Sequence, residues 1–402
     1  MNTIGPKTKH AALARPDLGE FGRHELALLG APCGLIQALA RDLARHLSPA
    51  LRVGYVDADH AGHDPETAAA PAAADFAESA FSAELTDKIS FRQLHTRRPL
   101  DRFSQPELLA HESLILINGN HFRARQQIVM LDPRKPLVRK LDRLTDVQLI
   151  LLSEGQTELP DYLQAHLAAT GRPLPLQLQL TDKEGIVAFI RHWYAAAVPP
   201  LRGLVLAGGL SQRMQTDKSR LQYHAQEQRA HAATLLAAVC QDVYVSGRPE
   251  QLADLPANLK PLPDKFLGLG PLGGLLTAFQ TDPNAAWLVL ACDLPFLTPA
   301  TLEFLVENRA PGRFATTFQS SENEFPEPLI TIWEPRSYAV LLRFLSLGYS
   351  CPRKALINSD IELLPAPRPA ELRNINTPDE AATARTELGL IAEKSGCYYQ
   401  QK

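Results

Sequence analysis

The chain has 402 residues, of which 45% are hydrophobic and 21% charged, so it is long enough for two domains and has the balance of a soluble globular protein. Its formal net charge of −3 gives no general attraction for nucleic acid, and we expect no nucleic-acid partner. The cysteines form no Cys-x-x-Cys pair, no signal-peptide pattern is present and no apolar run is as long as a membrane span, which predicts a cytoplasmic protein with reduced thiols and no membrane partner.

The first predicted elements follow an N-terminal stretch without periodic pattern, which we expect to be a mobile arm. An apolar run, a glycine-containing turn, an amphipathic stretch and a second apolar run predict a strand, a loop, a helix and another strand. This order is typical of the start of a P-loop NTPase. The predicted elements are Leu26–Leu29, residues 30–34, Leu35–Leu47 and Val53–Val56.

The residues that would grip a triphosphate are missing from this pattern. If Gly30 starts the phosphate loop, Ile36 and Gln37 occupy the places of its lysine and its hydroxyl residue. A later apolar run, Ser113–Ile117, ends in Asn118, where such proteins usually present a carboxylate. We therefore expect a degenerate P-loop NTPase-like domain that neither hydrolyses nor tightly binds nucleoside triphosphates.

A group of possible metal ligands follows the second strand. A loop of this kind can gather ligands around a cation, but it can equally be solvated. No second histidine-bearing element stands at a matching spacing, which favours the solvated loop. The residues are Asp57, Asp59, His60, His63 and Asp64.

A domain boundary is predicted at Pro199-Pro200. The helix predicted over Ile186–Ala197 must stop there, and two prolines stiffen a short link. We place the degenerate P-loop NTPase-like domain at 1–198 and a second domain at 199–402. Strands and helices alternate in both, which predicts an α/β fold with two Rossmann-like three-layer domains.

The second domain opens with a strand that runs into two glycines and two cations. The apolar run ends in Leu206-Ala207, followed by Gly208-Gly209 and then by Arg213 and Lys218. Glycines let the backbone approach a ligand, and a lysine adds positive charge, so the pattern predicts a phosphate-binding loop. It is not a Walker A loop, because no Gly-Lys-Ser/Thr closes it.

Two further strand ends point to the same region. Val243–Val245 ends in Ser246, and a glycine-dense loop, Gly268–Gly274, follows Asp264 and leads into a helix. The carboxyl ends of parallel strands are where open α/β sheets bind ligands. A turn-forming serine and a flexible Gly-Pro hairpin are the alternatives, but the hairpin does not explain the helix that starts at once.

A third strand carries a carboxylate at its tip. Trp287–Cys292 is apolar throughout and predicts a central strand buried on both faces, and Asp293 follows it directly. A buried carboxylate is costly unless it is paired, and Mg²⁺ is its natural partner where phosphates bind. The alternative is a helix N-cap, but Thr298-Pro299 already supplies the cap of the next helix.

These segments resemble the motifs of molybdenum cofactor guanylyltransferases, whose first motif is L-A-G-G-x-S-x-R-M-G-x-D-K. The likeness covers about residues 201–390 and includes Cys292-Asp293-Leu294-Pro295; Gln215 stands where the family has glycine, and Ser246 where it has asparagine. The resemblance implies a nucleotidyltransferase fold of the nucleotide-diphospho-sugar transferase type. It also implies transfer of GMP from GTP to the phosphate of Mo-molybdopterin, release of pyrophosphate, and use of Mg²⁺.

The resemblance implies roles for individual residues. Lys218, Arg213 and Asp293 would be catalytic, with Asp293 on the metal. The nucleotide would be bound by Leu206, Ala207, Gly208, Gly209, Lys218, Ser246, Asp264 and Asp293. The second substrate would contact Gly273, Arg353, Lys354, Asn374 and Asn376, although a solvated basic turn is equally consistent with Arg353-Lys354. A capping box explains Thr377 and Glu380 but neither asparagine.

The first half, over about residues 22–195, resembles the small P-loop adapter protein that partners the guanylyltransferase. This resemblance implies acceptor molybdoenzymes or their chaperones as further partners. Two alternatives stay open: a cytidylyltransferase or sugar-phosphate nucleotidyltransferase of the same fold, and a non-catalytic cofactor-assembly protein. Gly208 with Asp217-Lys218 favours the guanylyl branch, and Lys218 with Asp293 argues against a non-catalytic role.

Overall fold

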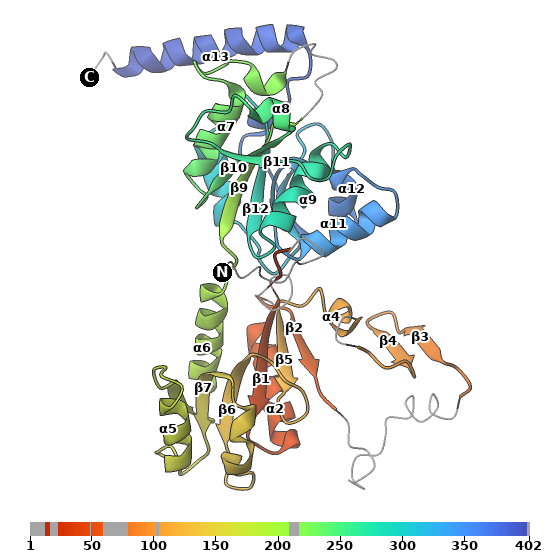
Figure 1. The fold of residues 1–402 in the computed structure, drawn as a ribbon, viewed down its shortest axis with the longest axis vertical. Coiled ribbons are helices and arrows are strands. Elements are labelled where there is room, and N and C mark those ends of the chain that lie inside the picture. Colours follow the sequence, from red (N-terminus) through yellow and green to blue (C-terminus); the bar gives the residue numbers. More distant parts are fainter. Residues whose placement is uncertain are drawn as a thin grey trace, which may run out of the picture. The chain divides into compact units, whose positions relative to one another are not determined.

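The structure, a computed structural model, describes residues 13–16, 23–48, 50–58, 79–101, 104–208 and 217–399. Contacts between residues divide the chain into two compact units (Figure 1). The first comprises His24–Trp193, and the second comprises chiefly the chain from Tyr194 onward. The dividing point lies within helix α6 (Lys183–Ala196), shortly before Pro199-Pro200. Each unit has its own sheet and helices, so the predicted α/β class is confirmed.

The sheet of the first unit is parallel throughout and has six strands in the order β2-β5-β1-β6-β7-β8. Its central strands are runs of buried apolar residues, as expected inside a parallel sheet. The strands are β1 (His24–Leu29), β2 (Val53–Val56), β5 (Leu114–Asn118), β6 (Gln126–Leu131), β7 (Asp146–Leu152) and β8 (Leu176–Gln179), and a separate hairpin pairs β3 (Ala83–Asp87) with β4 (Arg92–Thr96).

Helix α2 (Cys33–Leu47) shows how the pattern of the sequence shapes this unit. Its buried residues recur every three or four positions and so give the helix one apolar face. It begins at Cys33 rather than at the predicted Leu35, directly after the connection Gly30–Pro32. The other helical segments are η1 (Leu137–Arg143), α4 (Ser104–Leu108), α5 (Asp161–Ala168) and α6.

Polar side chains of the first unit bind one another at the carboxyl ends of its strands. Asn118 is fully buried and donates from its amide to Asp57 at 2.8 Å, and the hydroxyl of Tyr55 donates to the same carboxylate at 2.7 Å. The other members of the proposed ligand group, residues 59–64, lie outside the described residues. Within the described ranges, no group of three or more His, Cys, Asp or Glu side chains is arranged to hold a metal ion.

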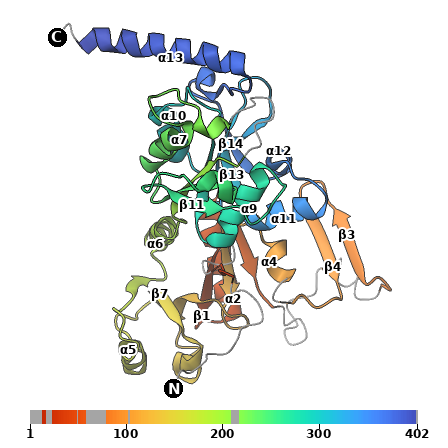
Figure 2. The ribbon, with the colours of Figure 1, turned by 45° about the horizontal axis from the view of Figure 1, so that its top comes forward.

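The second unit is built on a seven-stranded mixed sheet in the order β11-β10-β9-β12-β14-β13-β15. Figure 2 labels β11, β13 and β14 of this sheet. Strands β9 to β12 are parallel, and β14 is antiparallel to both of its neighbours. The strands are β9 (Leu201–Leu206), β10 (Val243–Gly247), β11 (Lys260–Pro263), β12 (Ala286–Ala291), β13 (Ala315–Gln319), β14 (Pro326–Trp333) and β15 (Ile361–Leu364).

Two apolar cores lie on opposite faces of this sheet. Along β12, Leu288 and Leu290 point to one core, and Trp287 and Val289 to the other, as the two-residue period of a strand requires. Helices α7 (Gln228–Ala237) and α10 (Pro299–Glu307) pack on the first core; α9 (Pro271–Thr281), α11 (Ser337–Ser346) and α12 (Pro352–Ile357) pack on the second. The remaining helical segments are η2 (Lys218–Arg220), α8 (Pro249–Leu252), η3 (Pro369–Leu372) and α13 (Pro378–Tyr399).

The topology brings several polar strand ends to one edge. Because β9, β10 and β12 are parallel neighbours, the residues after Leu206, around Ser246 and at Asp293 lie at the same carboxyl edge of the sheet. Among the described residues, no helix combines the length and apolarity needed to cross a membrane.

Candidate functional site

A pocket of about 220 Å³ lies at this edge, between the ends of β9, β10 and β12 and the start of α9. It brings together the described residues that the sequence predicts for the nucleotide: Leu206, Ala207, Gly208, Lys218, Ser246, Asp264 and Asp293. Gly209 and Arg213 lie outside the described residues. Asp217, Gly270, Pro271 and Gly274 are among the other lining residues.

One end of the pocket is formed by a hydroxyl and a carboxyl group. Ser246 donates from its Oγ to Oδ1 of Asp264 at 2.5 Å, and the backbone nitrogen of Asp264 donates to Gly247 at 2.9 Å. Burial raises the pKa of the Asp264 carboxyl, and the bond from Ser246 only partly opposes this. The folded structure therefore disfavours the ionised form of the Asp264 carboxyl group.

Two glycines make room for this pair. A Cβ on Gly208 would lie 2.9 Å from Oδ2 of Asp264, and a Cβ on Gly274 would lie 2.4 Å from Oγ of Ser246. A side chain at either position would therefore displace the pair. Gly270 starts α9 with a φ of 56°, which glycine adopts without strain.

The other end of the pocket carries a cation and a second carboxylate. Nζ of Lys218 donates to Oδ1 of Asn376 at 2.7 Å and lies 3.8 Å from Oδ2 of Asp293. Oδ1 of Asp293 is buried and has no hydrogen-bond partner among the residues that the structure describes. Burial raises the pKa of Asp293, and the ammonium of Lys218 lowers it. Asp293 thus has one oxygen beside a cation and one that lacks a ligand.

The capping alternative for Asp293 does not hold, because Thr298 is the N-cap position of α10. The backbone carbonyl of Asp293 instead accepts from Ile375 at 2.9 Å, which holds the segment containing Asn374 and Asn376 beside the pocket. An unpartnered buried carboxylate oxygen fits a hard cation such as Mg²⁺, which commonly takes one or two carboxylates and completes its shell with phosphate and water.

A smaller pocket of about 140 Å³ adjoins the first and shares Asp293 and Leu329 with it. Arg353 lines it and places Nη2 3.4 Å from Oε2 of Glu327, while its Nε is buried and finds no hydrogen-bond partner in the described ranges. Asn374 lines the same pocket. Local sequence patterns assign no ligand role to Glu327, because its place beside Arg353 depends on how β14 joins the sheet.

Two residues predicted to contact the second substrate, Lys354 and Gly273, are not among the residues that line the two pockets. Lys354 is exposed, and its Nζ lies 4.5 Å from the ring centroid of Tyr349. Gly273 is buried in α9, where a Cβ would lie 2.2 Å from the carbonyl oxygen of Phe266. Packing against that carbonyl is enough to require glycine at this position.

The predicted capping box is confirmed at α13. Glu380 accepts from the backbone nitrogens of Asn376 (2.6 Å) and Thr377 (3.3 Å), and Thr377 accepts from the backbone nitrogen of Glu380 (3.3 Å). These bonds leave the side chain of Asn376 outside the cap, so its contact with Lys218 is separate from helix formation.

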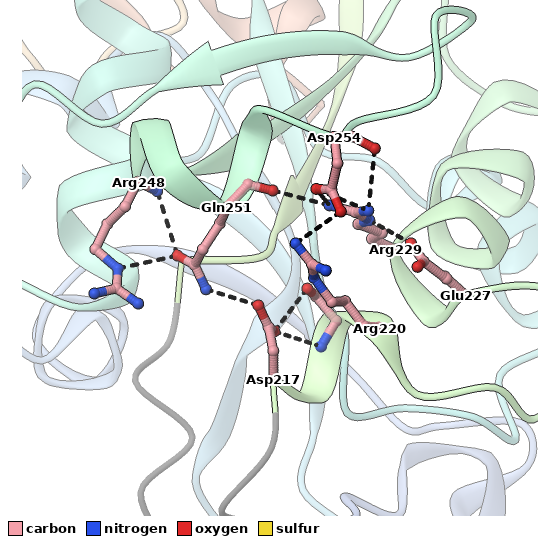
Figure 3. Close-up of polar contacts among 8 residues, drawn as sticks. Asp217, Arg220, Glu227, Arg229, Arg248, Gln251 and Asp254 are labelled. Carbon is pink, nitrogen blue, oxygen red and sulfur yellow. Dashed lines mark hydrogen bonds and ion pairs between the residues drawn. The ribbon is translucent and has the colours of Figure 1, made fainter.

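Figure 3 shows a network beside the pocket that no sequence pattern singles out. It joins Asp217, which precedes Lys218, to Gln251 and to the buried cation Arg229. These residues are far apart in the chain, and no local motif links them. Only the packing of α7 and α8 beside η2 brings them together.

Comparisons with known proteins place the site in a family context. Residues 203–359 match the family described as MobA-like NTP transferase domain. A probable molybdenum cofactor guanylyltransferase from Carboxydothermus hydrogenoformans is 32% identical over 183 residues, which are 43% of this chain and 89% of that protein.

Two other similar proteins are a curated relative and a solved structure. A molybdenum cofactor biosynthesis bifunctional protein from Synechocystis sp. is 35% identical over 182 residues, 45% of this chain, and the chain spans about half (52%) of that protein's length. The crystal structure of molybdopterin-guanine dinucleotide biosynthesis protein A from Archaeoglobus fulgidus is 21% identical with a TM-score of 0.41, over 47% of this chain and 98% of that one.

The pKa of Asp264 predicts a pH-dependent effect on stability. A carboxyl whose pKa is raised by folding makes folding costly once it ionises, so stability falls as pH rises from the ordinary aspartate pKa through the raised one. Asp264→Asn removes this cost and keeps an acceptor for Ser246. We expect a higher Tm than wild type at pH 7, with the gap closing as the pH falls toward about 4.

Thermal melts across this pH range measure the effect. Glu303→Gln, which removes an exposed carboxylate on α10, is the matched control and should show no such gap. A Tm difference for Asp264→Asn that stayed constant over the whole pH range would contradict the assigned cause.

Proposed function

Since this chain belongs to the molybdenum cofactor guanylyltransferase family, we propose that it transfers the GMP moiety of GTP to the phosphate of Mo-molybdopterin and releases pyrophosphate. The observation that carries this proposal is that Nζ of Lys218 lies 3.8 Å from Oδ2 of Asp293 at the edge of the sheet, while Oδ1 of Asp293 has no hydrogen-bond partner within the described part of the chain. A cation beside a carboxylate in need of a ligand suits a triphosphate that binds together with a divalent metal.

The two ends of the main pocket suit the two parts of a nucleotide. Asp264 and Ser246 would contact the base, and Lys218 would contact the phosphates. Guanine presents two adjacent donors on its pairing edge, N1–H and the amino group, and a carboxylate can accept from both, whereas cytosine presents one amino donor beside an acceptor nitrogen. This chemistry favours guanine over cytosine in the proposed reaction. The sugar would contact the backbone of Leu206–Gly208, which lines the same pocket. Gly208 has no side chain that would obstruct this contact.

The smaller pocket suits the acceptor. Its guanidinium, Arg353, would bind the phosphate of the pterin, and Asn374 and Asn376 would contact neighbouring polar groups. Because Asp293 lines both pockets and Asn376 of the smaller pocket contacts Lys218 of the larger one, an acceptor phosphate placed there would face the α-phosphate of the nucleotide. Asn376 would then have two roles, because its side-chain oxygen also accepts a hydrogen bond from the ammonium of Lys218 at 2.7 Å.

The reaction needs charge stabilisation more than a base. The acceptor is a phosphate monoester whose oxygen is already anionic, so no proton has to be removed. The barrier comes from the repulsion of two anions and from the charge that grows on the leaving pyrophosphate. Lys218 would stabilise that charge. Mg²⁺, held by Asp293, would supply further positive charge when bound.

The first unit supports a role other than nucleotide hydrolysis. Only Gly30, Ala31 and Pro32 connect β1 to α2, which is too short to wrap a phosphate as a Walker A loop does. Asn118, at the position of the usual carboxylate, already donates to Asp57. We therefore propose that residues 1–198 form a degenerate P-loop adapter that presents an acceptor molybdoenzyme or its chaperone to the transferase at 199–402.

Lys218→Ala tests the phosphate assignment. The variant should lose about tenfold to a hundredfold in affinity for GTP, because one charge-assisted contact disappears, and should keep its affinity for guanosine. Calorimetry with both ligands measures the two affinities. Lys260→Ala, which removes an exposed lysine paired with Asp242, is the control and should change neither. Equal losses for GTP and guanosine in Lys218→Ala would mean that Lys218 only shapes the pocket.

Asp293→Asn tests the metal assignment. The side chain keeps its size, but the charge that would hold Mg²⁺ is removed, so we expect turnover to fall by orders of magnitude while guanosine affinity stays unchanged. Pyrophosphate release, measured over a range of Mg²⁺ concentrations, is the readout. Wild-type turnover with an unchanged Mg²⁺ dependence would rule out this role for Asp293.

A further inference from the structure

The short helix η2 is tied to α8 by the carboxylate of Asp217 (Figure 3). Oδ1 of Asp217 accepts from the backbone nitrogen (3.0 Å) and the hydroxyl (2.7 Å) of Ser219, and so caps the helix. Oδ2 of the same carboxylate accepts from the side-chain amide of Gln251 at 3.0 Å. Lys218 is the next residue after Asp217, so this carboxylate fixes the point from which the lysine side chain extends.

Gln251 is itself held firmly. Its side-chain oxygen accepts from Nε (3.1 Å) and from the backbone nitrogen (3.4 Å) of Arg248. Its backbone carbonyl accepts from Nη1 of Arg229 at 2.9 Å. Gln251 and Arg229 are only 8% and 2% exposed, so neither moves without disturbing the core. The amide of Gln251 is therefore a fixed anchor for Asp217.

A second tie holds the far end of η2. Arg220 pairs with Oδ2 of Asp254 at 2.8 Å, and Oδ1 of Asp254 lies 3.3 Å from Nη1 of Arg229. Arg229 also donates to Glu227 at 2.7 Å. Figure 3 shows the two ties meeting on this guanidinium. The segment with Lys218 is thus held on both sides by a framework built around one buried cation.

These ties are needed because η2 has only 3 residues, Lys218–Arg220. A single helical turn fixes several backbone angles for very few hydrogen bonds, so it has little stability of its own. A small displacement of a charged group from its ligand is costly in catalysis. The direction of the Lys218 side chain therefore depends on contacts outside η2.

We propose that Gln251 is a positioning residue that acts through Asp217 to aim the ammonium of Lys218 at the nucleotide phosphates. This inference rests on the proposed function, because it takes the phosphates as the ligand of Lys218. It adds a residue from α8 that lines neither pocket among the described residues. Gln251 has no proposed contact with substrate, and its effect should appear only in phosphate binding and in turnover.

Gln251→Glu is the first variant in the test. It keeps the size of the side chain and the acceptor for Arg248, but it places a second carboxylate against Asp217. Repulsion should displace the start of η2 and lower the affinity for GTP about tenfold, with guanosine affinity unchanged. Calorimetry with GTP and with guanosine gives the two values. Gln241→Glu, which adds the same charge at an exposed position before β10, is the matched control and should leave both values unchanged.

The double variant Asp217→Asn with Gln251→Glu is the rescue. The amide introduced at position 217 would donate to the new carboxylate at position 251 while its oxygen still caps η2, so the tie returns with donor and acceptor exchanged. We expect GTP affinity to return to within about threefold of wild type, since the geometry of Lys218 is restored. In Asp217→Asn alone, the amide nitrogens at positions 217 and 251 would face each other, and neither can accept a hydrogen bond. The GTP affinity of this single variant should therefore stay below that of the double variant.

These measurements distinguish a positioning role of Gln251 from a purely structural one. Equal losses for GTP and guanosine in Gln251→Glu, or a double variant no better than Gln251→Glu, would overturn it. Both affinities are measured without the pterin, so they are independent of guanylyl transfer. A wild-type chain that prefers GTP to guanosine but transfers no GMP would contradict the proposed function alone. A wild-type chain without that preference would overturn both.

Discussion

The second unit depends on a carboxylate that the fold buries without fully pairing. All six residues of β12 are buried and apolar, and the chain presents Asp293 directly after Cys292. The ammonium of Lys218 lies close enough to offset part of the cost, yet burial still raises the pKa of the carboxyl. A carboxylate that costs stability, and whose Oδ1 has no hydrogen-bond partner among the described residues, is best explained by a ligand that is bound during function.

The same constraint recurs at the other end of the pocket. Burial raises the pKa of Asp264 as well, and its one hydroxyl donor, Ser246, does not offset this. Two glycines, Gly208 and Gly274, leave room for this pair where a Cβ would collide with it. Two of the carboxylates that line this pocket thus have different surroundings: Asp293 lies beside a cation and Asp264 beside a hydroxyl. Under the proposed function, this difference would let one end of the site bind the base and the other the triphosphate.

Structural features that depend only on residues close together in the sequence could be predicted. The apolar run before Asp293, the strand that ends at Leu206 and the capping box at Thr377 each depend on neighbours in the chain, and each element formed as expected. Helix α2 begins two positions before the predicted residue because it includes Gly34, and glycine is a poor helix former that the local pattern assigns to the turn.

Features that depend on packing could not be predicted. Gln251 meets Asp217 only because α8 lies beside η2, and a residue 34 positions away leaves no local signal. The requirement for glycine at 273 comes from the carbonyl of Phe266, which a motif cannot reveal. Whether Lys354 faces a ligand or solvent likewise depends on how α12 packs, and it lies over Tyr349. The local sequence pattern determines which helices and strands form, and tertiary contacts determine these side-chain positions.

The central claim is that the pocket binds GTP for transfer to a phosphorylated pterin. Release of pyrophosphate by the full chain, with Mg²⁺ and Mo-molybdopterin and with GTP, CTP, ATP or UTP in turn, tests it most directly. The account predicts rapid release with GTP, little with the other three, and none when the pterin is left out. Release that is as fast with CTP as with GTP, or that occurs equally without the pterin, would contradict it.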